Sequence, residues 1–313
     1  MVWVLRIVGA LGLVVVAWCC LTAWPAIVHG HPAYAVLLIL TVALSVFAIV
    51  KSMRPREGMR RWRRSLGIVG IVGFAAWIAL MAWLRPFPAV EPALTAMESS
   101  NTVTVTESPT QIVMVPTTGA SSTGIFFQPG AKVDARAYAA VLRPLAEAGY
   151  PVVITKQPLG IAFLATNAFE SARDANPAVT DWFVGGHSLG GTVAAMDAEA
   201  HGSDATAPVS GLILYASYPA SDMSTTLKSK VLSISGTQDG LATPADIQAS
   251  KAKLPKDAIF TPIDGAVHAF FGDYGPQPGD GTPTITHDEA RALIARNTLV
   301  FVAGVEHNAD VGG

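Results

Sequence analysis

The front of the chain contains three long uncharged stretches that are separated by short polar segments. They cover residues 7–24, 33–50 and 66–84, and each is close to the ~20 residues that a helix needs to cross a bilayer. A single stretch of this kind also fits a buried helix of a globular domain, but three in succession favour membrane spans. Residues 1–85 are therefore predicted to form a membrane anchor of three transmembrane helices.

The first apolar stretch also has features of a cleaved signal peptide, because it lies close to the N-terminus. However, only Arg6 precedes it, no convincing small-x-small cleavage site follows it, and two more apolar stretches come after it. We therefore interpret it as a retained anchor.

The loops between these stretches predict how the chain is oriented in the membrane. Segment 51–64 has seven basic residues and one acidic residue, whereas loop 25–32 has no lysine or arginine. Basic loops stay on the cytoplasmic side. The N-terminus is therefore expected in the cytoplasm and everything after Arg85 outside it, with the chain integral to the cell membrane. A nucleic-acid site in the basic segment is the competing interpretation, but its position between two spans makes membrane topology the simpler cause.

After residue 85 the pattern changes to short strand-like runs that alternate with helical periodicity. The clearest helix is predicted over 133–149, with Gly149 at its C-terminal cap. Strands are predicted at 102–106, 112–116, 124–127, 151–155, 182–187, 211–216, 231–235 and 258–263. Such alternation predicts an α/β fold, a mostly parallel sheet with helices on both faces.

Proline, serine and threonine are frequent over 86–110, which predicts a linker that merges into the first strand. The α/β domain then covers 111–313. The connection between Tyr215 and Val231 is too short for the large lid that many lipases insert there.

Charge and cysteine content narrow the function classes. Residues 86–313 contain 12 basic and 22 acidic residues, so the outer domain has a net charge of about −10. This argues against polyanionic partners, and no nucleic-acid partner is expected.

Both cysteines, Cys19 and Cys20, lie in the first apolar stretch. The outer domain therefore has no disulfide, thiol nucleophile or thiolate metal site.

The motif Gly186-His187-Ser188-Leu189-Gly190 follows a predicted buried strand and opens a helix. This pattern predicts a sharp turn that exposes a nucleophilic serine, here Ser188. A plain structural turn is one alternative. A phosphate-binding loop is another, because Gly185, Gly190 and Thr192 have the right spacing, but Gly191 stands where the essential lysine would be.

A serine nucleophile needs a histidine base, and the histidine needs an acid that orients it. In the expected chain order, Asp239 follows the predicted strand 231–235 and His268 follows 258–263. Both would project from the carboxyl ends of strands, where open α/β sheets build their sites. Asp264 is the reserve acid, because it lies close to His268 in sequence.

An oxyanion intermediate also needs preorganised N–H donors. The backbone N–H of Leu189, at the start of the helix after the serine, is one candidate. The loop after strand 124–127 offers the second, from Ala131 or a neighbour, since Gly130 lets the backbone approach the substrate.

Four stretches of the chain occur in the order of a known family. They are FFQPGAKVDARAYAAVLRPLAEAGYPVVITKQPLGIAFL, GGHSLGG, GTQDG and HAFFGDYGPQPGDG. Region 126–281 thereby resembles the α/β-hydrolase superfamily, in particular its small dienelactone-hydrolase-like branch, often labelled α/β-hydrolase fold 5. The resemblance implies a triad of Ser188, Asp239 and His268. Dienelactone hydrolases use a cysteine nucleophile, which this region lacks, so their substrate chemistry is not carried over.

Together these features predict a membrane-anchored serine hydrolase that cleaves a small-molecule or lipid-like ester through an acyl-enzyme at Ser188, without a cofactor or metal. An acyltransferase with the same triad and a non-catalytic binding domain are the alternatives. A calcium site at Asp273 and Asp280 is a further possibility, but glycine-rich turns account for both residues and the spacing is not that of an EF-hand loop.

Overall fold

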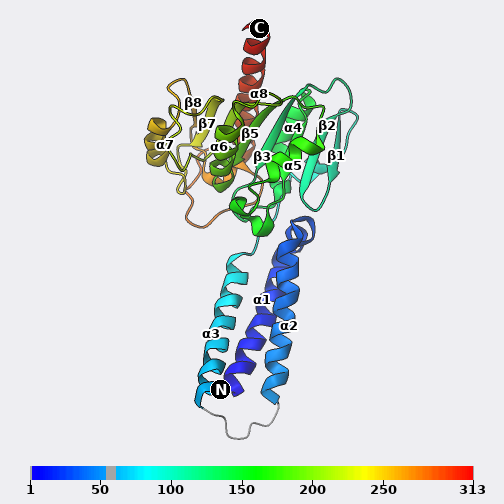
Figure 1. Cartoon of the computed structure of the whole chain (residues 1–313), viewed down its shortest axis with the longest axis vertical. Coiled ribbons are helices and arrows are strands. Elements are labelled where there is room, and N and C mark those ends of the chain that lie inside the picture. Colours follow the sequence, from blue (N-terminus) through cyan, green and yellow to red (C-terminus); the bar gives the residue numbers. More distant parts are fainter. Residues whose placement is uncertain (1, 54–60, 313) are drawn as a thin grey trace. The chain divides into compact units, whose positions relative to one another are not determined.

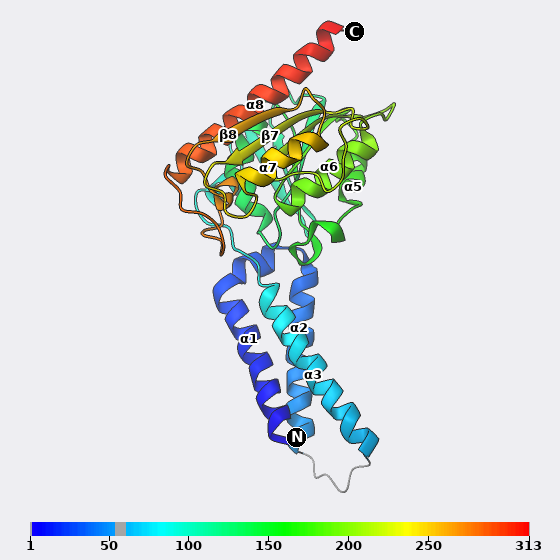
Figure 2. The same cartoon turned by 90° about the vertical axis from the view of Figure 1, so that its left-hand side faces the viewer.

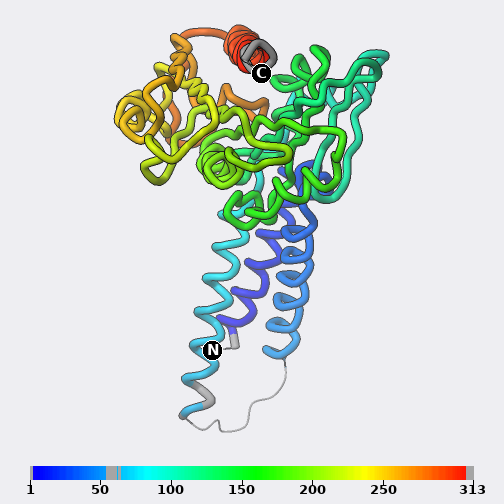
Figure 3. Tube along the Cα trace, turned by 45° about the horizontal axis from the view of Figure 1, so that its top comes forward, coloured from blue at the N-terminus to red at the C-terminus, as the bar shows by residue number. Residues whose placement is uncertain are grey.

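The computed structural model describes residues 2–53 and 61–312. The chain divides into two compact units, Met1–Pro86 and Phe87–Gly313, and Figure 3 follows its path through both. Seven residues of the predicted cytoplasmic segment, 54–60, lie outside the described residues.

Where it is described, the first unit contains three helices, α1 (Val2–His29), α2 (Pro32–Met53) and α3 (Arg61–Trp83) (Figure 1). All three include a segment long and apolar enough to cross a membrane, Trp3–His29, Pro32–Met53 and Ser65–Trp83. Helix α1 is kinked at Ala23, where φ is −143°. Pro25 accounts for the kink, because it lacks an N–H and its ring crowds the preceding turn.

Among the described residues, polar side chains join α2 to α3 at two points. The Tyr34 hydroxyl in α2 donates to the Met81 carbonyl of α3 over 2.8 Å, and the Trp77 indole N–H donates to the Thr41 hydroxyl over 2.8 Å. Inside an apolar environment such groups cost free energy unless they are paired. The hydrogen bonds therefore fix α3 against α2.

The second unit is built on an eight-stranded sheet in the order β1-β2-β4-β3-β5-β6-β7-β8. Strands β3 to β8 are parallel to one another, and β1 and β2 pair antiparallel at one edge. The strands are β1 (Val103–Glu107), β2 (Gln111–Pro116), β3 (Thr123–Gln128), β4 (Val152–Thr155), β5 (Asp181–His187), β6 (Val209–Tyr215), β7 (Lys230–Gly236) and β8 (Ile259–Ile263). The mostly parallel sheet predicted from the sequence is confirmed.

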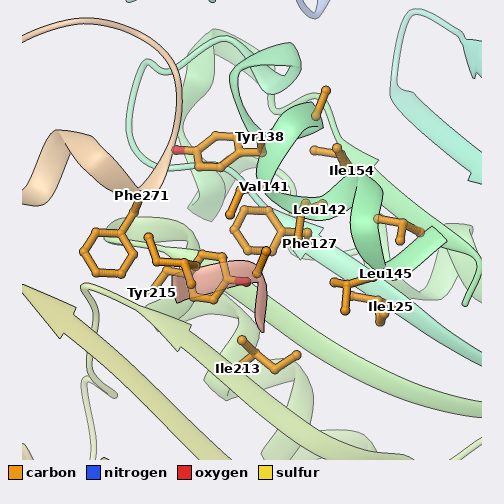
Figure 4. Packing of buried hydrophobic residues seen from close by; sticks show 14 of the residues in the cluster. Ile125, Phe127, Tyr138, Val141, Leu142, Leu145, Ile154, Ile213, Tyr215 and Phe271 are labelled. Carbon is orange, nitrogen blue, oxygen red and sulfur yellow. The ribbon is translucent and has the colours of Figure 1, made fainter. Parts of the chain in front are cut away.

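Helices cover both faces of this sheet (Figure 2). They are α4 (Ala139–Glu147), α5 (Ala168–Ala175), α6 (Leu189–His201), α7 (Pro244–Ser250) and α8 (His287–Gly312). Helices α4 and α8 pack on one face, and α5 and α6 on the other. Side chains of successive residues in β3 point to opposite faces of the sheet, as they do in any strand. Phe127 joins the first core, which Figure 4 shows, and Phe126 the second.

The helix predicted over 133–149 begins later than expected. Val133 is instead paired with Phe87 in a parallel bridge. Asp134 caps a short 3-10 helix, η2 (Ala135–Tyr138), by accepting from the Arg136 N–H, and α4 follows it. A side-chain cap of this kind marks the point where helical backbone starts. Gly149 adopts φ +109° just beyond the helix, as a terminating glycine does.

Helix α6 carries a buried carboxyl group, that of Asp197. Asp197 is 7% exposed and accepts a 2.8 Å hydrogen bond from the Gln128 side-chain amide at the end of β3. Burial raises the pKa of Asp197 to about 7, and the hydrogen bond from Gln128 opposes that shift. The folded protein therefore keeps a proton that the unfolded chain releases near pH 4.

Replacement Asp197→Asn should remove one pH-dependent contribution to the stability of the folded protein. Between about pH 4 and 7 this carboxyl group binds a proton in the folded chain but not in the unfolded chain, so its contribution to stability falls as pH rises, by up to about 4 kcal/mol. Asparagine still accepts from Gln128 but does not ionise. From pH 5 to pH 8, the thermal unfolding midpoint of the wild-type full chain in detergent should fall relative to that of Asp197→Asn, because only the wild type loses this contribution. The exposed Asp174→Asn is the control and should behave like the wild type.

Candidate active site

The loops that follow the carboxyl ends of β3, β5, β7 and β8 carry every residue that the sequence nominates for catalysis. In a parallel sheet these ends lie at the same edge. Ser188 directly follows β5, and Asp239 lies three residues beyond β7. His268 starts the short 3-10 helix η6 (His268–Phe271) after β8. The topology therefore brings together residues that are 80 positions apart in the chain.

Ser188 occupies a strained turn between β5 and α6. Its φ is +51° and its ψ is −123°, a backbone conformation that residues with a side chain rarely adopt. A hydrogen bond to the neighbouring strand β6 stabilises the turn: the Ser188 N–H donates to the Tyr215 carbonyl over 3.0 Å. The Ser217 hydroxyl donates to the Ser188 carbonyl over 2.6 Å. This geometry presents the serine hydroxyl at the tip of the turn.

Two glycines allow strand and helix to cross this closely. A Cβ at Gly186 would overlap the backbone of Gly190, and a Cβ at Gly190 would overlap the carbonyl oxygens of Gln128 and Pro129. The second overlap matters because Gln128 and Pro129 lead into the loop that carries Ala131. The turn at Ser188 and that loop therefore pack backbone against backbone.

Asp239 and His268 form a buried pair. The distance from His268 Nδ1 to Asp239 Oδ2 is 2.9 Å, and the two residues are 1% and 3% exposed. The other carboxylate oxygen of Asp239 accepts from the N–H groups of Leu241 and Ala242, each over 2.8 Å. An aspartate so held accepts the Nδ1 hydrogen and leaves Nε2 of the imidazole free to take a proton.

The reserve acid, Asp264, lies elsewhere. It is exposed and accepts a 3.0 Å hydrogen bond from the Thr237 hydroxyl. The structure therefore pairs His268 with Asp239 rather than with its close neighbour in sequence.

Asp280 links the loop that contains Asp239 to the loop that contains His268. The sequence alone does not reveal this role. Its carboxylate accepts from the N–H groups of Gly240 (3.2 Å) and Gly281 (2.8 Å) and from those of His268 (3.1 Å) and Ala269 (2.8 Å). Gly240 directly follows Asp239. One carboxylate thus fixes the backbone on both sides of the Asp239–His268 hydrogen bond.

Both residues of the possible calcium site, Asp273 and Asp280, have partners within the protein. Asp280 is committed to backbone N–H groups, and Asp273 forms an ion pair with Arg291. Within residues 2–53 and 61–312 no group of three or more His, Cys, Asp or Glu side chains could hold a metal ion.

His187 is a second residue that the sequence analysis did not single out for a role. Its ring is 1% exposed and lies 4.5 Å from the His268 ring, centroid to centroid. Burial, and then the neighbouring His268, hold the pKa of His187 well below its usual range. A neutral ring can pack against the His268 ring without electrostatic repulsion.

The His187 ring also connects to the loop after β3. Its Nδ1 lies 2.8 Å from the Tyr138 hydroxyl, which accepts a 2.9 Å hydrogen bond from the Gly130 N–H. The hydroxyl hydrogen is therefore directed at His187 Nδ1. Tyr138 fixes the position of Gly130, next to the candidate donor Ala131.

The N–H groups around Ala131 have defined acceptors. Gly130 N–H donates to Tyr138, Lys132 N–H to the Gly160 carbonyl (2.7 Å) and Val133 N–H to the Gly130 carbonyl (3.1 Å). In the described part of the chain, the N–H of Ala131 has no such acceptor. As the first residue of α6, Leu189 has no acceptor for its N–H within the helix, and none is found elsewhere among the described residues.

Ser188 and His268 line the same cavity, of about 340 Å³. Its wall includes Leu189, Tyr218, Leu241 and Gln277. No hydrogen bond between Ser188 Oγ and His268 is formed within the described residues. Such contacts are often long in unliganded sites and shorten when substrate binds. A larger open groove of about 780 Å³ lies at the amino ends of β6 to β8 beside α8 and contains neither residue.

Comparisons with known proteins agree with this architecture. Residues 124–292 match the sequence profile of a family described as "Alpha/beta hydrolase family". No curated protein matches the chain.

Several solved structures resemble the chain. A protein from Thermoplasma acidophilum, described as a predicted CIB-like hydrolase, is 15% identical and has a TM-score of 0.49, with 64% of this chain and 98% of that chain covered. An alpha-beta serine hydrolase homologue from Coxiella burnetii is 18% identical with a TM-score of 0.43, covering 64% and 98%. A thermophilic esterase from Thermogutta terrifontis is 16% identical with a TM-score of 0.42, covering 64% and 91%.

Replacement Gly190→Ala should destabilise the protein, because the new methyl group would overlap two backbone carbonyl oxygens that cannot move independently. We expect a loss of about 1–3 kcal/mol, measured as a fall in the thermal unfolding midpoint of the full chain in detergent. Gly304→Ala in α8 is the matched control, since a methyl group there meets no atom within 4 Å. It should leave the midpoint unchanged or raise it slightly. Equal midpoints for the two variants would contradict the close crossing.

Proposed function

The chain belongs to the alpha/beta hydrolase family, and from this premise we propose that it is a membrane-anchored serine hydrolase that cleaves an ester bond. Ser188 is the nucleophile, His268 the general base and Asp239 the acid that orients the base. The observation that carries the proposal is the buried Asp239–His268 hydrogen bond of 2.9 Å. His268 lines the same cavity as Ser188, which lies on a strained turn.

The reaction follows from the roles of these groups. His268 Nε2 takes the Ser188 proton as the serine oxygen attacks the ester carbonyl, and the resulting imidazolium is stabilised by Asp239. The N–H groups of Leu189 and Ala131 donate to the negative oxygen of the tetrahedral intermediate. The intermediate collapses, and His268 returns the proton to the departing alcohol. Water then attacks the acyl-enzyme by the same steps and releases the acid.

Neighbouring groups support this chemistry without reacting. Asp280 holds the backbone on both sides of the acid–base pair. Neutral His187 lies against the His268 ring and adds no positive charge beside it. These contacts keep the base in one orientation, so little reorganisation is needed when substrate enters.

The proposal includes a membrane topology in which the hydrolase domain lies outside the cytoplasm. The support is the distribution of basic residues in the sequence, with seven in segment 51–64 and none in loop 25–32. The three apolar helices act as the anchor.

Treatment of the purified full chain with a fluorophosphonate probe should label Ser188 covalently. The probe reacts with serines that an adjacent base activates. Ser188→Ala should abolish labelling and ester hydrolysis, while the partly exposed Ser224→Ala retains both. Intact-mass and peptide mass spectrometry locate the modified residue. Labelling at another serine, or none on folded protein, would overturn the proposal.

Replacement Asp239→Asn should reduce kcat for ester hydrolysis by about 10³–10⁴-fold, because asparagine does not hold His268 in the useful tautomer. Asp264→Asn, a change at the exposed neighbouring carboxylate, should leave kcat within about twofold of the wild type. Steady-state kinetics with a water-soluble ester measure both. If the Asp264 variant loses activity and the Asp239 variant does not, the assignment of the acid is wrong.

A further inference from the structure

Exposed apolar side chains occur on segments that follow the carboxyl ends of β4 and β7. Phe163 and Leu164, in the short 3-10 helix η4 (Ala162–Leu164) after β4, are 46% and 54% exposed. Leu241 is 37% exposed and lines the cavity that contains Ser188. Adjacent large apolar side chains on a surface are typical of an interaction site.

The segment with Phe163 and Leu164 is attached to the loop that carries Ala131. The Gly160 carbonyl accepts a 2.7 Å hydrogen bond from the Lys132 N–H. A Cβ at Gly160 would contact the Lys132 Cα at 2.7 Å, so the two backbones touch. The segment that carries these exposed side chains therefore adjoins the loop that contains Ala131.

The linker that enters the second unit is bound to the same loop. Phe87 donates its N–H to the Lys132 carbonyl over 2.7 Å and accepts from the Asp134 N–H over 3.0 Å. Val90, which is 42% exposed, donates its N–H to the Asp273 carbonyl over 2.8 Å. Asp273 follows η6, which begins with His268. The linker thus pairs with segments on both sides of the site.

Only three residues, 84–86, separate Phe87 from Trp83, the last residue of the third candidate span. Four residue steps reach at most about 14 Å when fully extended. This limit comes from the covalent chain and applies to every arrangement of the two units. The Lys132 carbonyl, bonded to Phe87, is therefore always tethered close to the point where the chain leaves the apolar span.

We propose that Val90, Phe163, Leu164 and Leu241, here called the apolar rim, contact the lipid surface, and that the site takes an amphiphilic ester that resides in the same membrane. This inference rests on the proposed hydrolase function and names its substrate class. The contact is apolar rather than electrostatic, because a domain with 22 acidic and 12 basic residues is not attracted to anionic lipid. Leucine and phenylalanine suit the boundary between headgroups and acyl chains.

The test uses the full chain reconstituted in phosphatidylcholine vesicles and two substrates. One is a water-soluble acetate ester, and the other is a long-chain acyl ester dissolved in the vesicle membrane. The double variant Phe163→Ser with Leu164→Ser should reduce hydrolysis of the embedded ester by about tenfold, because apolar area that contacts lipid is lost. Hydrolysis of the soluble ester should be unchanged. Ile259→Ser is the control, since Ile259 is 52% exposed at the amino end of β8, away from the site edge.

A second variant tests the tether without altering the rim. Insertion of a flexible 20-residue glycine–serine segment between Pro86 and Phe87 removes the length limit. It should lower hydrolysis of the embedded ester and leave that of the soluble ester unchanged.

The outcomes separate this inference from the proposed function. Hydrolysis of the soluble ester but not of the embedded ester overturns the inference and leaves the hydrolase intact. Equal losses on both substrates in the rim variant also overturn it, since the rim would then serve folding or chemistry. If the rim variant instead converts a stable dimer to a monomer, a second copy of the chain is the true partner. Failure of the wild type on both esters and with the fluorophosphonate probe rejects the hydrolase itself.

Discussion

The close crossing of β5 and α6 at Ser188 is the constraint on which the site depends. The turn is tight enough to force the serine to a φ of +51°, and it leaves no space for a Cβ at Gly186 or Gly190. The strain is maintained because the parallel strands on both sides fix the start of the turn and the buried face of α6 fixes its end. A looser crossing would lower the strain but would also withdraw the hydroxyl from the cavity.

Around this crossing, side-chain acceptors position the backbone of the loops. Asp280 accepts four N–H groups from two loops, and Tyr138 accepts one from a third. Each of these hydrogen bonds restricts the loop backbone, since another arrangement would leave its N–H donor unsatisfied. The loops at the sheet edge are therefore ordered by hydrogen bonds to side chains rather than by regular secondary structure.

The sequence predicts the elements well and their mutual contacts poorly. Every predicted strand appears within two residues of its expected ends, because apolar runs bounded by glycine and proline are local signals. The helix at 133–149 starts late because Phe87, 46 positions earlier, pairs with Val133. The roles of Asp280 and His187 depend likewise on partners that meet only after folding. Motif order nominates Ser188, Asp239 and His268; their chemistry remains a prediction.

The pairing of Phe87 with Val133 changes where the second unit begins. Counted by regular secondary structure, that unit would start at β1 with Val103, and the preceding residues would look dispensable. Yet Phe87 gives and receives hydrogen bonds with Lys132 and Asp134. A soluble fragment cut at the first strand would lose these bonds and leave the adjoining backbone groups unsatisfied. A fragment designed for expression without the apolar helices should therefore retain Phe87 and the residues after it.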